Sequence, residues 1–182
     1  MGRIVEFELE KLVVGIMYVN QQVYVQALTA LSDAFGKVDN VMDEYSFSRY
    51  STFYDSEMGG HVLKRFVSFE RLVNPSLLPK IKCWTNELES RLSNESGRCV
   101  NIDPCILGHG RFVMATTKGA SFRVPLQDGI FADISLVYSR NEWHHFFWTY
   151  HDVKSDFFKR FLIGVRTLYL HQRTRAANGD VK

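Results

Sequence analysis

The chain has 182 residues, of which 46% are hydrophobic and 23% are charged, a composition that excludes an intrinsically disordered or fibrous protein. Its formal net charge is only +2, so bulk charge gives no strong signal for binding to nucleic acid or to a membrane surface. The aromatic content is high, with 14 Phe, 8 Tyr and 3 Trp, and it favours a large core, an aromatic-lined pocket, or both.

The early part of the chain carries no targeting signal that we recognise. Its apolar run, residues 12–19, is less than half as long as a membrane-spanning helix requires. The run follows Glu6, Glu8 and Glu10, where a signal peptide would carry basic residues. The three cysteines are an odd number without a C-x-x-C pair, which argues against a disulfide framework. We therefore expect a cytoplasmic protein with reduced thiols and no membrane partner.

The first 71 residues predict a strand, a helix and a second strand. Residues 11–19 are β-branched and almost continuously apolar, as in a central strand that is covered on both faces. Apolar residues then recur at helical spacing over residues 21–35, between a capping Asn20 and Gly36. Residues 46–60 indicate an irregular loop rich in Tyr, Ser and Phe. Residues 61–71 alternate between the two faces of a strand.

The second half adds a helix, a hairpin and a terminal helix. Asn74 and Pro75 open a helix whose regular part runs over residues 79–92, and residues 98–102 predict a short strand. Residues 106–117 are ambiguous between helix and strand. Two apolar segments, residues 121–126 and 131–138, flank a hairpin turn at Asp128-Gly129, and residues 156–175 form an amphipathic helix.

This order of elements predicts an α+β fold in a single domain of residues 1–182. Its first part reads β-α-β-β-α-β, the order of a ferredoxin-like sheet with both helices on one face. The β-hairpin and the C-terminal amphipathic helix would extend that core.

Known catalytic and metal-binding motifs are absent from the sequence. It has no P-loop and no G-x-G-x-x-G motif after a strand. His144, His145 and His151 cluster with Asp152, but without a recognised ligand spacing, so we expect no metal. Cys105 and His109 lack a third orienting group, so we expect a buried cysteine rather than a nucleophile.

Polar residues beside apolar strands form the best candidate site. Lys64 and Arg65 project to opposite sides of one strand, so one of them faces inward and needs an acidic partner or an anionic ligand. Asn101 and Asp103 share one face at the end of another strand. We expect these segments to converge on a pocket for an anion with a planar ring. The candidate ligand-binding residues are Tyr50, Thr52, Tyr54, Lys64, Arg65, Asn101, Asp103, Thr117 and Lys118.

A resemblance to a known family rests on several segments. They are KLVVGIMY, STFYDSEMG, LKRFVSFERLVNP, KCWTNELE, GRCVNIDPCIL, ATTKGASFRVPLQDGIFADISLVY and FFWTYHD. Together they resemble domain of unknown function 4416, a family of bacterial and archaeal proteins of about this length. The resemblance implies a compact domain without an assigned function. Some members carry a GTP-binding label, which implies a nucleotide-like ligand, although this sequence has no P-loop.

Two motifs describe this family, and both are altered here. The F-T-x-Y-Y-like motif corresponds to residues 51–54, with Phe53 where a tyrosine is usual. The D-P-G motif corresponds to Asp103, Pro104 and Cys105, with cysteine in place of glycine. If that glycine provides backbone freedom or lets a ligand approach closely, Cys105 would impair the site.

Three functions from different classes stay open at this point. The first is a binding domain for an anionic small molecule, including a nucleotide such as GTP. The second is an enzyme that uses Asp103 or Glu57 as acid or base together with a lysine. The third is an interaction or homo-oligomerisation module built on the aromatic residues. The sequence implies no particular cofactor.

Overall fold

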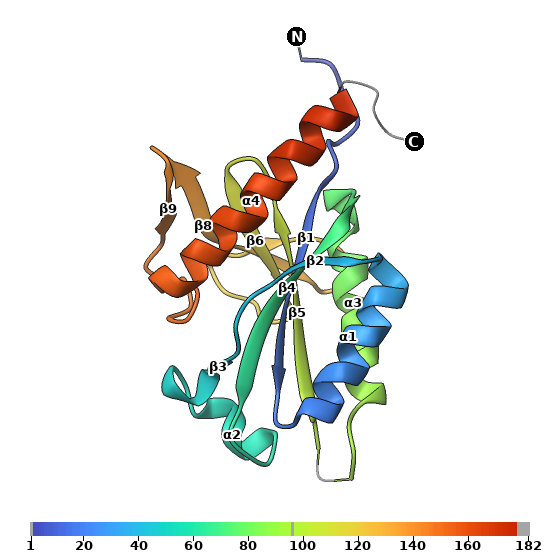
Figure 1. Cartoon of the computed structure of the whole chain (residues 1–182), viewed down its shortest axis with the longest axis vertical. Coiled ribbons are helices and arrows are strands. Elements are labelled where there is room, and N and C mark those ends of the chain that lie inside the picture. The colour runs from blue at the N-terminus through green and yellow to red at the C-terminus, as the bar shows by residue number, and fades with distance from the viewer. Residues whose placement is uncertain (1, 96, 178–182) are drawn as a thin grey trace.

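A computed structural model describes residues 2–95 and 97–177. Within these ranges a nine-stranded antiparallel sheet is accompanied by four α-helices (Figure 1). The strands are β1 (Glu10–Tyr18), β2 (Val38–Val41), β3 (Tyr45–Ser46), β4 (Leu63–Val73), β5 (Val100–Leu107), β6 (Arg111–Thr116), β7 (Val124–Pro125), β8 (Phe131–Ser139) and β9 (Glu142–His145). The helices are α1 (Gln21–Phe35), α2 (Phe53–Glu57), α3 (Leu78–Arg91) and α4 (Asp156–Ala177).

Strand β1 lies at the centre of the sheet, as its apolar sequence predicts. The strand order is β2-β4-β1-β5-β6-β8-β7, with β3 also paired to β4 and β9 to β8. All nine residues of β1 are buried, because β4 and β5 flank it and helices cover both of its faces. Gly15 is needed here, since a Cβ atom would lie only 2.8 Å from the ring of Phe66.

Helices α1 and α3 pack on one face of the sheet, and α4 crosses the other (Figure 1). Helix α1 begins at Asn20, whose side chain accepts a hydrogen bond from the backbone N–H of Val23 at 3.0 Å. It ends at Gly36, whose φ of 93° favours glycine. On the opposite face α4 buries Phe158, Leu162 and other apolar residues against the sheet. The covering of both faces explains the nearly continuous apolar character of β1.

Most of the predicted elements are confirmed, with changes in their limits. Helix α1 has the predicted bounds, and the hairpin turn contains Asp128 and Gly129, both at positive φ. The ambiguous residues 106–117 contain the end of β5 and all of β6. Strand β5 is longer than predicted, while β7 has only two residues. The expected loop at residues 46–60 contains the short helix α2.

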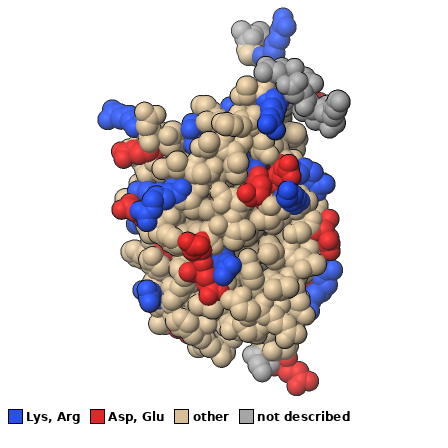
Figure 2. All heavy atoms as spheres, viewed as in Figure 1, with Lys and Arg blue, Asp and Glu red and all other residues tan. Residues whose placement is uncertain are grey.

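The surface matches the balanced charge of the sequence. On the face shown in Figure 2, acidic and basic side chains form small mixed groups rather than an extended patch of one sign. In residues 2–95 and 97–177, no helix combines the length and apolar character needed to cross a bilayer.

Candidate functional site

The candidate site lies where the sheet opens between β5 and β6. Only Cys105–Leu107 of β5 pair with β6, whereas the whole of β5 pairs with β1 on its other side. The first half of β5 therefore has a free edge inside the molecule. Pro104 stands directly before the paired part, where the missing N–H of a proline costs no ladder hydrogen bond.

Two side chains of α3 bind the free edge of β5 in place of a neighbouring strand. The backbone N–H of Ile102 donates to Glu89 Oε1 at 2.7 Å, and Lys82 Nζ donates to the carbonyl oxygen of Ile102 at 2.7 Å. Both charged side chains are buried. Buried backbone groups need such partners, so these two bonds satisfy the N–H and carbonyl groups of Ile102 where β5 has no neighbouring strand.

The opening forms a pocket with a solvent-accessible volume of about 100 Å³. Its wall combines α3, the first half of β5, the residues that follow β6, and single residues from distant segments. The polar side chains of this wall are Tyr54, Lys64, Lys82, Asn86, Glu89, Arg98, Asn101, Asp103, Thr116, Thr117, Lys118, Tyr150 and Asp152.

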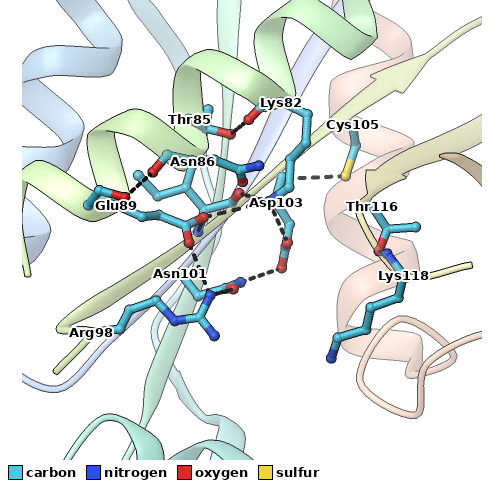
Figure 3. A network of polar contacts seen from close by, with 12 residues as sticks. Lys82, Thr85, Asn86, Glu89, Arg98, Asn101, Asp103, Cys105, Thr116 and Lys118 are labelled. Atoms are coloured by element: carbon cyan, nitrogen blue, oxygen red, sulfur yellow. Dashed lines mark hydrogen bonds and ion pairs between the residues drawn. The ribbon is translucent and has the colours of Figure 1, made fainter. Parts of the chain in front are cut away.

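A chain of polar contacts runs along one side of this pocket (Figure 3). Lys82 Nζ lies 3.4 Å from Asp103 Oδ1 and 3.6 Å from Glu89 Oε1. Arg98 donates to Glu89 at 3.1 Å and to Asn101 Oδ1 at 2.9 Å, and it also pairs with Glu57 on the rim. Asn101 Nδ2 in turn donates to Asp103 Oδ2 at 2.8 Å. Lys82, which is buried, and Arg98, which is half-buried, thus each have a carboxylate partner.

Lys64 is the inward-facing cation predicted from β4, and its partner is Asp152. The two side chains form a buried ion pair at 2.7 Å, and Tyr45 also donates to Asp152, at 2.9 Å. Burial opposes the charge of Lys64, but the nearby carboxylates of Asp152 and Asp103 outweigh it and raise the pKa of Lys64. Lys64 is therefore a charged and fully compensated part of the pocket wall.

Lys118 differs from the other three cations of the pocket. It follows β6, stands across from the contact chain in Figure 3, and is exposed. In the described part of the chain no carboxylate lies within 4.0 Å of its ammonium group. Its contacts are the Tyr54 hydroxyl at 3.5 Å and the rings of Phe53 and Tyr54, whose centroids lie 5.2 and 5.6 Å away.

Six of the nine candidate residues line this one pocket, and three do not. Those that line it are Tyr54, Lys64, Asn101, Asp103, Thr117 and Lys118. Arg65 does not, because alternation along β4 turns it to the opposite face, where it pairs with Glu44 at 3.6 Å. Tyr50 packs its ring against Tyr45, and Thr52 is exposed at the start of α2.

Sequence reasoning missed several residues of the pocket wall, among them Lys82, Glu89 and Arg98. Lys82, Asn86 and Glu89 recur at intervals of four and three residues, which places them on one face of α3. That polar stripe beside the apolar one was the available signal. Asp152 had been grouped with the histidines, and no comparable spacing pointed to its pairing with Lys64.

The cysteine and histidine candidates lie elsewhere. Cys105 is buried between Val13 and Met114, its pKa is raised by burial, and it does not line the pocket. Cys105 lies in the extended strand β5 and is not among the residues with positive φ, so its own backbone conformation does not require glycine. Among the described residues, no three His, Cys, Asp or Glu side chains are arranged to hold a metal ion.

The fold and site together define an α+β protein with a large antiparallel sheet and a charged pocket at a gap between two strands. Residues 8–169 match the family described as domain of unknown function (DUF4416), and the chain belongs to that family. The altered family motifs meet at the pocket, to which one contributes Tyr54 and the other Asp103. No curated protein and no solved structure is significantly similar to the chain.

Proposed function

We propose that this protein binds a small anionic molecule in the pocket beside the first half of β5. The supporting observation is Lys118, the pocket cation without a carboxylate partner in residues 2–95 and 97–177. Lys64, Lys82 and Arg98 are each paired with a carboxylate, so an anion beside Lys118 would gain attraction that no neighbouring acid already supplies.

A nucleotide such as GTP is a larger candidate ligand for the same pocket. The pocket is small compared with the several hundred Å³ that usually enclose a drug-sized ligand, so a nucleotide would place one phosphate inside it. Its base would then lie over the rim, where Phe53 is 65% exposed and the Lys118 ammonium lies 5.2 Å from the centroid of its ring.

We propose a ferredoxin-like unit made of β1, α1, β2, β4, α3 and β5, with the later elements as its extension. The antiparallel order β2-β4-β1-β5 and the shared core of α1 and α3 support this assignment. The cytoplasmic location expected from reduced thiols stays a prediction.

Two other functions have an observation in their favour. An enzyme is favoured by Asp103, which faces the pocket 3.4 Å from Lys82 and could exchange a proton with a bound molecule. An interaction or homo-oligomerisation module is favoured by an aromatic cluster in which Trp148 stacks on Phe122 and Phe146, beside Phe147, which is 84% exposed.

The proposed function is tested by ligand-induced thermal stabilisation with inorganic phosphate and with GTP. A ligand that binds only the folded protein raises its melting temperature by mass action. We expect at least one of these anions to stabilise the wild type and Lys118→Gln to lose most of that response. Lys80→Gln is the matched control, because Lys80 is an exposed lysine of α3 outside the pocket. Equal responses of Lys118→Gln and Lys80→Gln would contradict the proposal.

A further inference from the structure

The pocket offers a carboxylate to its ligand as well as an ammonium group. Three carboxylates line it, and they differ in how far a ligand can reach them. The side chain of Asp103 is 20% exposed, compared with 8% for Glu89 and 2% for Asp152. Asp103 is therefore the acceptor that a bound molecule meets.

Asp103 has hydrogen-bonding capacity left after its contacts within the protein. Oδ1 faces Lys82 at a long 3.4 Å, and Oδ2 accepts from Asn101 at 2.8 Å. A carboxylate offers about four lone-pair sites, so each oxygen can accept one further hydrogen bond from a ligand. An anionic group placed beside Asp103 would be repelled by that carboxylate, so the part of the ligand that contacts Asp103 is a hydrogen-bond donor and the anionic part lies at Lys118.

The charges around Asp103 favour a neutral hydroxyl over an ammonium group as the ligand's hydrogen-bond donor. Lys82 already places a positive charge 3.4 Å from Asp103, and the charge of Lys64 also acts on this carboxylate. A third ammonium group would be repelled by both lysines, whereas a hydroxyl would not. Further hydroxyls of the wall, on Tyr54, Thr117 and Tyr150, suit a ligand with several hydroxyl groups.

We propose that the ligand is a small hydroxylated anion, a sugar phosphate or sugar acid, whose anionic group binds Lys118 and whose hydroxyl donates to Asp103. This inference rests on the proposed function and names the class of molecule bound there. The volume of about 100 Å³ restricts the enclosed part of the ligand to a few carbon atoms with their hydroxyls.

The test compares ligands that differ in the donor beside the anion. Ribose 5-phosphate and gluconate carry hydroxyls, phosphoethanolamine carries an ammonium group, and inorganic phosphate carries no carbon-bound donor. Each is titrated by calorimetry into the full chain, into Asp103→Asn, and into Asp128→Asn as a control. Asp128 lies in the β7–β8 turn at positive φ, a conformation that asparagine tolerates.

We expect ribose 5-phosphate or gluconate to bind the wild type at least tenfold more tightly than inorganic phosphate and phosphoethanolamine do. Asp103→Asn should remove this preference but keep phosphate binding, because Lys118 is unchanged, and Asp128→Asn should behave as the wild type. Melting temperatures report whether Asp103→Asn is folded, with Lys82 still held by Glu89 and the Ile102 carbonyl oxygen.

Different failures identify which proposal is wrong. If inorganic phosphate binds as tightly as the hydroxylated anions, or if phosphoethanolamine binds more tightly, the sugar inference is overturned and the anion site stands. A folded Asp103→Asn that retains the preference also overturns the inference. If none of these anions binds the wild type, the proposed function fails together with it.

Discussion

Two of the clusters of buried charge in residues 2–95 and 97–177 differ in what completes them. In the first, Lys11 donates to Asp39 and to Gln172 Oε1, the latter at 2.9 Å, while Ser68 donates to Asp39 at 2.6 Å. In the second, Lys82 and its neighbours border the pocket, where Asp103 is part-exposed and Lys118 has no carboxylate within 4.0 Å among the described residues. Buried charge alone therefore does not mark a site. Our proposal for the pocket rests instead on hydrogen-bonding capacity that faces open space and is not used within the protein.

The largest effect should come from breaking the ion pair that closes the pocket wall. Lys64→Ala leaves the Asp152 carboxylate buried without its cation, which should lower the free energy of unfolding by about 3–5 kcal/mol. Urea denaturation measures this loss, with Lys80→Ala as the exposed control. A loss below about 1 kcal/mol, which is typical of surface ion pairs, would contradict our interpretation that this pair is buried and stabilising.

Lys11→Met should cost less and should leave anion binding unchanged. Asp39 keeps its hydrogen bond from Ser68 and has a side chain that is 16% exposed, so losing Lys11 should cost about 2 kcal/mol. Urea denaturation gives the stability, and the phosphate response is measured in parallel. A lost phosphate response in the folded variant would mean that the two clusters are coupled.

Cys105→Gly tests whether the family glycine belongs to the pocket or only to the strand. The variant loses a buried side chain and gains backbone freedom in β5, so we expect a loss of about 1–2 kcal/mol. Cys105→Ala separates the two causes. Anion-induced stabilisation should be the same in all three proteins, and a stronger response in Cys105→Gly would show that cysteine limits the site.

Tyr54 should make stability depend on pH at the alkaline end. Burial, with help from the nearby Asp103 and Tyr150, raises the pKa of Tyr54 from 10 to about 12. Between pH 10 and pH 12 the folded state therefore keeps a proton that the unfolded state releases, so stability falls as pH rises. The fall should be smaller in Tyr54→Phe. Parallel curves for the free energy of unfolding would contradict this assignment.

The smallest effect is expected at Thr52, a candidate site residue from the sequence that does not line the pocket. Thr52 is exposed, and its side chain makes no capping hydrogen bond to α2. Thr52→Ala should therefore change stability by less than about 0.5 kcal/mol and leave the anion response unchanged. A reduced response would place the start of α2 within the binding site.

Local patterns determined much of the fold. Continuous apolar character identified β1, helical spacing with Asn20 and Gly36 fixed both ends of α1, and Asp128-Gly129 specified the hairpin turn. These patterns depend on residues that are close in the sequence, so they can be recognised without knowledge of the tertiary structure. For residues 106–117 periodicity alone was ambiguous, and pairing with β5 and β8 decided their conformation.

The candidate site was only partly contained in the sequence. Alternation along β4 required one of Lys64 and Arg65 to face inward, and the spacing of Asn101 and Asp103 placed them on one face of β5. Which of the two faces inward depends on tertiary structure. The partner of Lys64 is Asp152, which lies 88 residues away in the sequence and follows β9. The gap between β5 and β6 was likewise a tertiary outcome, because it exists only where Lys82 and Glu89 bind the strand edge that β6 leaves free.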